Sequence, residues 1–290
     1  MINLSVIILT YNEEMHIEDC IRGVYGWAED IFIVDSFSTD RTLETARRYT
    51  DKIWQNPFVN QARQLNWALA NLPIKTEWVM RLDADERPTP ELKEELETGI
   101  AGVDKGVSGL YIKRRVFFMG RWIRHGGYYP TWILRIWRKG RCYCEERSMD
   151  EHMRLAWGAP FFLKNDFIDD NRKGLHWWIA KHNDYARREA AEMLKTGRAG
   201  RPEGIPAKIF GTQEERKRWL KERLYARTPL FVRPFLYFVY RYFFRLGFLD
   251  GKEGLVWHFL QGFWYRFLVD AKILEIKRGM MARGGQYGNS

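Results

Sequence analysis

The sequence has little cysteine and no signal-like start. Its three cysteines, Cys20, Cys142 and Cys144, supply no disulfide framework, and the chain opens on a strand pattern rather than on a basic and then apolar leader. Both absences favour a reducing, cytoplasmic location. Cys142, Cys144 and His152 could be three zinc ligands, but a fourth ligand is missing and the spacing is unlike that of common zinc sites. Alternation along a strand is the simpler interpretation of Cys142 and Cys144.

Two frequent nucleotide-binding motifs are also absent. The first apolar run, residues 4–9, continues into Thr10-Tyr-Asn-Glu13, with neither Gly-x-Gly-x-x-Gly nor Gly-Lys-Ser/Thr. The glycines of those motifs let a backbone approach phosphates closely. Their absence from the first turn argues against a dehydrogenase and against a P-loop enzyme.

Acidic residues are scarce toward the C-terminus. Residues 201–290 hold 17 Lys and Arg against 8 Asp and Glu, which accounts for nearly all of the net charge of +10. The basic residues of this region are interleaved with Phe, Tyr, Trp and Leu. That mixture favours an anionic membrane surface over nucleic acid as the partner, with a merely solvated basic face as the alternative.

No apolar stretch is uninterrupted enough for a convincing membrane span. Two aromatic-rich segments, residues 229–249 and 254–276, are near the length of a span, but ionisable residues interrupt both. Amphipathic helices in the headgroup region would satisfy the charges and the aromatics, so we expect peripheral or monotopic attachment. An ordinary helical subdomain and a re-entrant hairpin are the alternatives. The interrupting residues are Arg233, Arg241 and Arg245 in the first segment, and His258, Arg266 and Asp270 in the second.

The N-terminal third of the sequence alternates strand and helix patterns. Apolar runs typical of strands buried in a parallel sheet occupy residues 4–9, 31–34, 52–54 and 78–82. Segments with helical character follow each of them, at residues 17–24, from 42, at 60–72 and from 89. This alternation predicts an α/β fold with right-handed crossovers, whose ligand crevice lies beyond the carboxyl ends of the strands.

From about residue 109 the pattern changes. The β-like stretches 110–118 and 131–137 predict an antiparallel extension of the sheet, and residues 175–194 predict a helix. The Gly- and Pro-rich stretch 197–206 follows that helix and is the best candidate for a domain boundary.

An acidic cluster, Asp83-Ala-Asp-Glu86, follows the strand predicted at residues 78–82. Because the carboxyl ends of parallel strands meet at one edge, Asp83 should lie near Tyr11 and Asp35, which follow the first two strands. Carboxylate oxygens suit Mg²⁺ or Mn²⁺, which keep sites open for a diphosphate and make it a good leaving group. A helix N-terminus or a solvated turn would also use acidic residues. The position after a buried strand is what favours a metal site.

Three motifs, in this order, resemble the serial motifs of glycosyltransferase family 2. They are Ser5-Val-Ile-Ile-Leu-Thr-Tyr-Asn-Glu13, Ile33-Val-Asp-Ser-Phe-Ser-Thr-Asp40 and Leu82-Asp-Ala-Asp-Glu-Arg87. Two more, Phe118-Met-Gly-Arg-Trp-Ile-Arg-His-Gly-Gly127 and Phe248-Leu-Asp-Gly251, are similar to a subgroup that includes lipopolysaccharide-core β-glucosyltransferases. The resemblance implies a GT-A fold and inversion at the anomeric carbon.

The resemblance also implies roles for individual residues. Those placed at the nucleotide are Thr10, Tyr11, Glu13, Asp35 and Arg63. The first three would contact the base and ribose, and Asp35 would accept a hydrogen bond from the base. Asp83 would support the ribose or the metal, and Asp85 would hold the metal. Simpler interpretations are that Tyr11 caps the sheet and that Arg63 is a solvated helix residue.

One-step inversion needs a base that removes the acceptor hydroxyl proton opposite the leaving diphosphate. The resemblance places an acidic residue after the antiparallel stretch, where Glu151 matches best and Asp150 is the alternative. An ordinary polar turn is the third interpretation. We expect the loop at residues 169–174 to close over the site. Further candidates for contacts with phosphate or substrate, each with a surface or structural role as its alternative, are Arg114, Arg115, Arg121, Arg124, Arg135, His125, His176 and His182.

The sequence thus predicts an inverting, metal-dependent glycosyltransferase at the cytoplasmic face of a membrane. We expect a nucleotide-sugar donor, specifically a UDP-sugar, and as acceptor a hydroxyl of a lipid-linked glycan or of a lipopolysaccharide or capsule precursor. A polyprenyl-phosphate glycosyltransferase and a non-catalytic nucleotide-sugar-binding membrane adaptor are the alternatives. The expected organisation is a GT-A domain over residues 1–215, with a donor half (1–108) and an acceptor half (109–215), followed by a membrane-associated helical region over residues 216–290.

Overall fold

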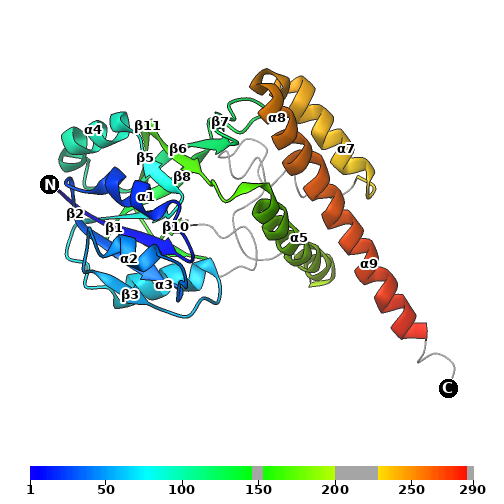
Figure 1. Cartoon of the computed structure of the whole chain (residues 1–290), viewed down its shortest axis with the longest axis horizontal. Coiled ribbons are helices and arrows are strands. Elements are labelled where there is room, and N and C mark those ends of the chain that lie inside the picture. Colours follow the sequence, from blue (N-terminus) through cyan, green and yellow to red (C-terminus); the bar gives the residue numbers. More distant parts are fainter. Residues whose placement is uncertain (146–152, 200–227, 286–290) are drawn as a thin grey trace. The chain divides into compact units, whose positions relative to one another are not determined.

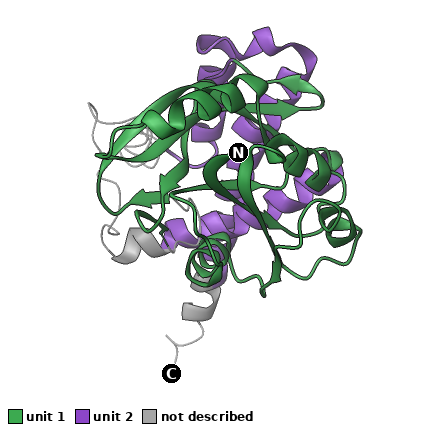
Figure 2. Cartoon of the chain, turned by 90° about the vertical axis from the view of Figure 1, so that its left-hand side faces the viewer, with its two compact units in different colours: residues 1–124, 128–174 green, residues 125–127, 175–290 purple. Residues whose placement is uncertain are grey.

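A computed structural model describes residues 1–145, 153–199 and 228–285. The chain forms two compact units, coloured separately in Figure 2. The first unit comprises residues 1–124 and 128–174, and the second comprises residues 125–127 and 175–290. The domain boundary predicted at residue 215 lies outside the described residues, and the long helix predicted before it belongs to the second unit.

The first unit is built on a nine-stranded mixed sheet, in which β7 pairs with β6 and the other strands have the order β3-β2-β1-β4-β8-β6-β11-β5 (Figure 1). The four strands β3-β2-β1-β4 are parallel to one another, as the sequence predicted. Their bounds are Ile2–Thr10 for β1, Ala28–Asp35 for β2, Ile53–Gln55 for β3 and Trp78–Asp83 for β4. Their carboxyl ends therefore lie at one edge of the sheet.

The predicted antiparallel extension is present, and it contains a strand that the sequence did not predict. Strand β8 runs antiparallel to both β4 and β6, whereas the unpredicted β11 runs parallel to β6. Strand β5 pairs antiparallel with β11, which sets Asp169 opposite Glu86. The carboxyl end of β11 thus reaches the acidic cluster. The bounds are Glu86–Pro88 for β5, Val107–Phe118 for β6, Arg121–Trp122 for β7, Trp132–Arg138 for β8 and Ala159–Asp170 for β11.

The helices of the first unit begin where the sequence signals placed them. Asn60 accepts a hydrogen bond from Arg63 N and caps α3, and Thr89 accepts one from Leu92 N and caps α4. Pro90, which lacks an N–H, follows at the first position of α4. The bounds are Ile17–Val24 for α1, Thr42–Ala46 for α2, Gln61–Asn71 for α3, Pro90–Gly99 for α4 and Ile100–Gly102 for the 3₁₀ turn η1.

The central strand β1 is buried on both faces. Alternate residues of a strand point to opposite sides, so Val6 and Ile8 pack in one core cluster with α1 and α4, and Ile7 packs in another with α3. All three side chains are fully buried. Truncating any of them to alanine should cost about 2–5 kcal/mol. This rigid strand carries the first loop of the site.

A two-stranded sheet of β9 (Cys142–Cys144) and β10 (Met153–Leu155) lies beside α3. The side chain of Asn66 accepts a hydrogen bond from Cys144 N at 3.0 Å and donates one to Cys144 O at 2.9 Å, which fastens β9 to that helix. Cys142 and Cys144 alternate with exposed Tyr143, as the strand interpretation predicted. His152 lies outside the described residues.

The second unit is helical in its described part. The two predicted C-terminal segments are helices, although each contains a stretch of π-helix. Ala186 and Ala190 of α5 pack against Tyr265, Val269 and Ile273 of α9 to form its core. No described helix combines the length and the apolar character that a membrane span requires. The bounds are Gly174–Ala199 for α5, Val232–Val239 for α7, Tyr240–Phe244 for η3, Gly247–Asp250 for η4, Gly251–Trp257 for α8, His258–Trp264 for η5 and Tyr265–Gly285 for α9.

Several of the charged residues that interrupt the apolar segments form ion pairs within the second unit. Arg233 Nε donates to Asp270 Oδ1 at 2.8 Å, and both side chains are buried. Asp270 Oδ2 also accepts a hydrogen bond from Phe231 N at 2.8 Å. Arg266 Nη1 lies 2.8 Å from Glu189 Oε1. These residues therefore join α7 to α9 and α5 to α9.

Candidate active site

Three strand ends of the first unit lie side by side. In the sheet register Thr10 pairs with Asp35, and Leu9, the residue before Thr10, pairs with Asp83. The polar residues predicted to share one crevice are therefore neighbours at the carboxyl edge of the sheet. Tyr11 follows directly and keeps 56% of its surface exposed.

The loops after β1 and β2 are fastened to each other. Asn12, which adopts a positive φ of 52°, donates through its N–H to Ser38 Oγ at 2.8 Å. Its side chain accepts a hydrogen bond from Thr39 N at 2.8 Å. Glu13 N donates to Thr42 Oγ1 at 2.7 Å, at the start of α2. These contacts fix the backbone from Tyr11 to Glu13 before any ligand arrives.

Asp35 is buried and organises the loop that follows β2. Its carboxylate accepts hydrogen bonds from Ser38 N at 2.9 Å, Ser38 Oγ at 2.5 Å and Gln55 Nε2 at 3.0 Å. The hydrogen bond that we expect between Asp35 and the base of the nucleotide stays a prediction. Beside it, Thr10 Oγ1 is buried and has no hydrogen-bond partner among the described residues. That hydroxyl is a polar atom at the strand ends that a ligand could satisfy.

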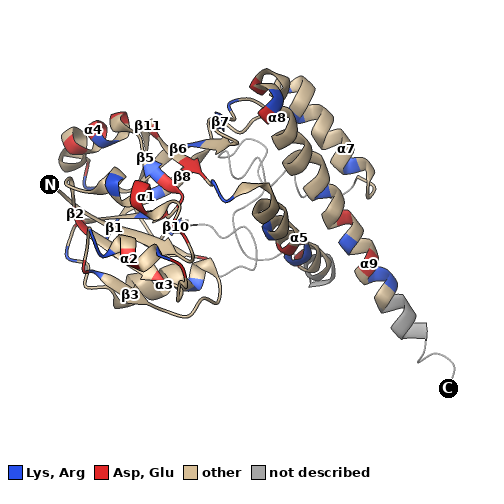
Figure 3. Ribbon diagram, in the orientation of Figure 1, with Lys and Arg blue, Asp and Glu red and all other residues tan. Residues whose placement is uncertain are grey.

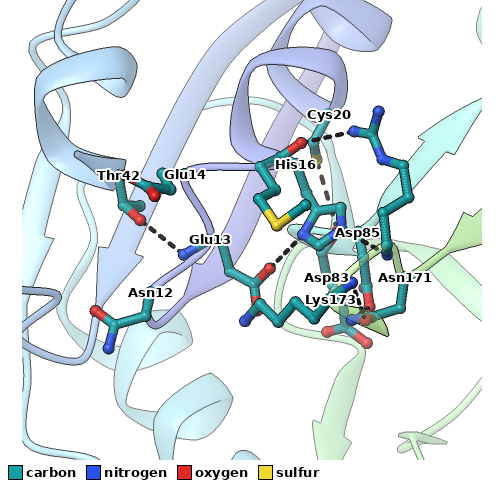
Figure 4. A network of polar contacts seen from close by, with 12 residues as sticks. Asn12, Glu13, Glu14, His16, Cys20, Thr42, Asp83, Asp85, Asn171 and Lys173 are labelled. Carbon is teal, nitrogen blue, oxygen red and sulfur yellow. Dashed lines mark hydrogen bonds and ion pairs between the residues drawn. The ribbon is translucent and has the colours of Figure 1, made fainter. Parts of the chain in front are cut away.

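Glu13 lies at the centre of a polar network that Figure 4 shows from close by. Its Oε1 accepts a hydrogen bond from Lys173 Nζ at 2.6 Å, and its Oε2 lies 2.7 Å from His16 Nδ1. His16 Nε2 accepts a hydrogen bond from Arg172 N at 2.8 Å, so the ring proton is on Nδ1 and is donated to Glu13. The segment after β11 is thereby tied to the loop after β1.

The first carboxylate of the acidic cluster, Asp83, is held by three donors. Its Oδ1 accepts hydrogen bonds from Gln61 Nε2 and Arg81 Nη2, both at 2.9 Å, and its Oδ2 lies 3.4 Å from Arg135 Nη2. The side chain keeps 27% of its surface exposed. Asp83 is therefore oriented by the protein while part of its carboxylate remains accessible.

Glu86, the last residue of the cluster, is structural. It is buried, accepts a hydrogen bond from Asp83 N at 3.0 Å and forms an ion pair with Arg135. Burial raises the pKa of Glu86 above its ordinary value, against the opposing effect of Arg135. Arg135 was a candidate for phosphate contacts, but it is buried beneath the cluster, where it holds these carboxylates in place.

Asp85 is oriented by the segment that follows β11. Its Oδ2 accepts a hydrogen bond from Asn171 Nδ2 at 2.8 Å, and its backbone oxygen accepts one from Asp170 N at 3.0 Å. Figure 4 shows Asp85, Asn171 and Lys173 on the same side of the network. One short segment therefore contacts both the acidic cluster and the Glu13 loop.

Several carboxylates lie close together at this edge, with basic side chains paired to them. Burial and the neighbouring carboxylates of Asp85 and Asp83 raise the pKa of Asp169, although Arg114 opposes the shift from 3.4 Å. A bound cation would relieve this repulsion. Within the described part of the chain, no group of three or more His, Cys, Asp or Glu side chains is arranged to hold a metal ion.

Other predicted positions include an exposed residue, a partly buried one that pairs with a carboxylate, and two that lie outside the described residues. Arg63 is exposed in the first turn of α3, close in sequence to Gln61, which bonds Asp83. Arg115 Nε contacts Asp166 at 2.6 Å. Asp150 and Glu151, the two candidates for the base, lie outside the described residues.

Sequence reasoning missed the roles of Asn171, Lys173, Gln61 and His16. The loop at residues 169–174 was expected to close over the site, and it does contact two of the site's loops, through Asn171 and Lys173. The available signal was the run of polar residues itself, Asp169-Asp-Asn-Arg-Lys-Gly174. The sequence did not predict β11, the strand that carries these residues to the edge of the sheet.

The two motifs of the suspected subgroup meet in the second unit. His125 N donates to Asp250 Oδ2 at 2.9 Å, and His125 Nδ1 lies 2.6 Å from Asp250 Oδ1. The neighbouring Gly126 and Gly247 have no room for a side chain, because a Cβ atom on either would lie within 2.6 Å of the His258 ring. Residues from the two motifs thus form one packed structure.

Comparison with known proteins decides the family. The family model described as Glycosyl transferase family 2 matches residues 5–166, which is more than half of the chain. The chain belongs to this family. With the mixed sheet, this makes the first unit of this glycosyltransferase a GT-A-like α/β domain followed by C-terminal helices, as the resemblance implied.

One relative of this glycosyltransferase agrees with the suspected subgroup, and another is uncharacterized. The lipopolysaccharide core biosynthesis glycosyltransferase LpsC of Rhizobium meliloti (strain 1021) is 27% identical over 284 residues, which cover 94% of this chain and 92% of LpsC. An uncharacterized glycosyltransferase of Rickettsia bellii (strain RML369-C) is 24% identical over 204 residues, which cover 67% of this chain and 69% of that protein.

Solved structures similar to this chain are more distant. S. aureus TarS 1-349 in complex with UDP-GlcNAc is 17% identical with a TM-score of 0.49, and the match covers 96% of this chain and 92% of that one. Glucosyl-3-phosphoglycerate synthase from Mycobacterium tuberculosis, in complex with Mn²⁺, UDP and glucosyl-3-phosphoglycerate, is 24% identical with a TM-score of 0.30 over 39% of this chain and 44% of that one.

Proposed function

We propose that this enzyme transfers a sugar from a UDP-sugar, with inversion and with the help of a divalent cation, to a hydroxyl of a lipid-linked glycan or lipopolysaccharide precursor at the cytoplasmic face of a membrane. The observation that carries the proposal is the position of Asp83 at the end of β4 and of Asp85 just beyond it, beside the polar ends of β1 and β2. The lipopolysaccharide precursor as acceptor class is supported by the similarity to LpsC along almost the whole chain.

The strand ends provide a fitting place for the nucleoside. Thr10 Oγ1 is a buried hydroxyl without a partner among the described residues, and Tyr11 offers an exposed ring on which a base could stack. Asp35 holds the next loop in position from beneath. These residues would bind and orient the donor, and the fixed backbone between them lowers the entropic cost of doing so.

The acidic cluster fits Mg²⁺ or Mn²⁺ bound together with a diphosphate. Such ions usually take one or two protein carboxylates and complete their coordination with phosphate oxygens and water. Asp85 would be the main ligand and Asp83 the second or a ribose contact. Burial is the main cause of the raised pKa of the nearby Asp169, and the carboxylates of Asp85 and Asp83 add to it. When bound, the cation would stabilise the charge that develops on the leaving diphosphate.

The transfer also needs a general base that takes the proton of the acceptor hydroxyl. The acceptor oxygen bonds to the anomeric carbon while the bond from that carbon to the diphosphate oxygen breaks, and the hydroxyl proton passes to a carboxylate. Glu151 is the proposed base and Asp150 the alternative. Glu151→Gln should therefore slow transfer while leaving donor binding almost intact. Full activity of that variant would exclude Glu151 and leave Asp150 as the next candidate to substitute.

The proposal is tested by product analysis with lipid-linked lipopolysaccharide precursors and a panel of UDP-sugars. A new glycosidic bond to an acceptor hydroxyl, with the anomeric configuration opposite to that of the donor, is the expected result. A sugar attached directly to a lipid phosphate would instead identify a polyprenyl-phosphate glycosyltransferase. Donor binding without either transfer or donor hydrolysis would identify a non-catalytic adaptor.

A further inference from the structure

Large apolar side chains are exposed along one continuous part of the second unit. Phe243 and Phe244, at the end of η3, keep 54% and 76% of their surface exposed. Single exposed apolar residues are ordinary on protein surfaces, but a contiguous set of this kind marks an interaction site. We call the following set the aromatic face: Val232, Phe235, Leu236, Tyr240, Phe243, Phe244, Leu246, Phe248 and Leu249.

The helix α7, which carries part of the aromatic face, packs against other helical residues on its opposite side. On α7, Phe238 meets the rings of Phe259 and Phe263 in η5, each at 6.4 Å between centroids. Pro234 and Arg233 of the same helix are buried. The exposed residues therefore do not belong to an unformed core, because α7 has its partner on the other side.

The charged residues within the segment that carries the aromatic face have one sign. Residues 229–249 contain three arginines and neither Asp nor Glu. Arg233 is buried with Asp270, which leaves Arg241 and Arg245 nearer the surface. The first acidic residue that follows, Asp250, is buried against His125. In Figure 3 the ribbon of α7 is tan apart from one blue stretch. The face is thus apolar, aromatic and positive.

We propose that the aromatic face docks this protein onto a lipid bilayer that contains anionic phospholipids, with the ring side chains in the interfacial layer and the arginines near phosphate groups. Aromatic rings and arginine are the side chains that favour this layer. Helix α7 has eight residues and is about 12 Å long, so it lies in the interface rather than across the bilayer. This inference rests on the membrane location in the proposed function and deepens it by naming the docking surface, and it does not depend on the donor.

The charge complementarity selects a lipid surface over an apolar protein groove. Each exposed arginine near an anionic surface strengthens binding about fivefold, and salt weakens this part of the attraction. Arg245 is exposed, and its Nη1 contacts Tyr240 OH at a long distance of 3.4 Å. Arg241 is half-buried and donates to Gly126 O at 2.5 Å, so Arg245 is the better residue to substitute.

The test is co-sedimentation of the full chain with vesicles of phosphatidylcholine alone or mixed with phosphatidylglycerol. Wild type should bind the mixed vesicles more tightly, and less so as salt rises. Phe243→Ser with Phe244→Ser should weaken binding roughly tenfold or more, because two rings no longer enter the interface. Arg245→Gln should weaken binding to the mixed vesicles about fivefold and leave binding to neutral vesicles nearly unchanged.

Matched controls come from the first unit. Phe58→Ser with Val59→Ser removes an adjacent pair that is 56% and 61% exposed, and Arg22→Gln removes an exposed arginine. Both should bind vesicles like wild type. Thermal unfolding checks that each variant folds, and Phe244→Ser alone replaces the double variant if that one does not. Equal binding by the aromatic-face variants and their controls overturns the proposal. So does loss of self-association in the Phe243/Phe244 variant with unchanged vesicle binding, which would assign the face to a second copy.

Discussion

Two pairs of carboxylates in this glycosyltransferase, one pair in each unit, have opposite environments. In the first unit, Asp83 and Asp85 lie at a strand end, oriented by amide and guanidinium donors, and part of Asp83 remains exposed. In the second unit, Asp250 and Asp270 are buried and bonded to His125 and Arg233. The first arrangement leaves a carboxylate partly accessible, whereas the second buries both carboxylates.

This difference bears on the surface of each unit. The segment 229–249 has neither Asp nor Glu and the adjacent Asp250 is buried, so the aromatic face contains no acidic residue, although Glu275 is exposed farther along α9. The first unit has Asp35 and Asp83 at the carboxyl ends of parallel strands, with Asp85 in the turn that follows. Residue composition alone would not separate these two uses, since both units contain aspartate next to arginine. The distinction lies in whether a carboxylate remains accessible.

The comparison predicts that removing a hidden carboxylate damages folding. Asp270→Ala should destabilise the second unit by about 3–5 kcal/mol, because it leaves the Arg233 guanidinium buried without its partner. Chemical unfolding, followed by a probe of the second unit, measures the loss. Replacing both residues, with Arg233→Met and Asp270→Leu, should recover most of the stability. If the single variant is as stable as wild type, the pair is not structural.

Removing an accessible carboxylate should damage activity instead. Asp85→Asn should lower the rate of sugar transfer about 10²-fold or more, since the leaving diphosphate loses its cation-mediated stabilisation. Its unfolding curve should match that of wild type. Asp51→Asn, at an exposed aspartate of the same unit, is the matched control and should retain full activity. Near-normal transfer by Asp85→Asn with Mn²⁺ present would remove Asp85 from the metal site.

The residues that orient Asp85 and Glu13 should have smaller effects. Asn171→Ala removes the amide that donates to Asp85 Oδ2, so it should weaken the apparent affinity for the cation about tenfold and leave the fold intact. Lys173→Met should act on donor affinity, because it leaves Glu13 without its cation. Titrations of Mn²⁺ and of donor, in the transfer assay, separate the two effects. An Asn171→Ala enzyme with unchanged cation dependence would contradict the positioning role.

The smallest expected effect concerns pH and the second unit. Burial lowers the pKa of His182 to about 4, although its ring also contacts Trp178 O at 2.8 Å. Protonation then favours the unfolded state, whose histidine titrates near pH 6.5, so this contribution to stability is complete above about pH 6.5 and is lost as the pH falls toward 4. Unfolding measured across this range should show a slope that His182→Phe reduces and that His176→Gln, at an exposed position, preserves.

Much of the fold followed from local patterns in the sequence. The strands β1, β2 and β4 are apolar runs with buried side chains, and the starts of α3 and α4 carry capping residues that act as predicted. Strand β11 was not predictable in this way. Its first four residues are exposed, and Lys164, Asn165 and Asp166 interrupt its centre, so neither alternation nor a continuous apolar run identifies it. Its pairing with β6 is set by tertiary structure.

The candidate site was predictable to the same degree. The clustering of Asp35 and Asp83 near Thr10 follows from strand order and is present in the register. The contacts of Asn171 with Asp85 and of Lys173 with Glu13 depend on β11, which lies more than 70 residues from the acidic cluster along the chain. No local sequence pattern predicts them. The burial of Arg135 beneath the cluster was not predictable from local sequence either, because β8 pairs with β4 only in the folded sheet.

The most direct test of the central claim is calorimetric titration of UDP into the enzyme, with Mn²⁺ and with a chelator in its place. If Asp83 and Asp85 form a cation site at the donor diphosphate, Mn²⁺ should strengthen UDP binding in wild type and should not do so in Asp85→Asn. Affinity for UDP that is the same with Mn²⁺ and with chelator in wild type would contradict the claim.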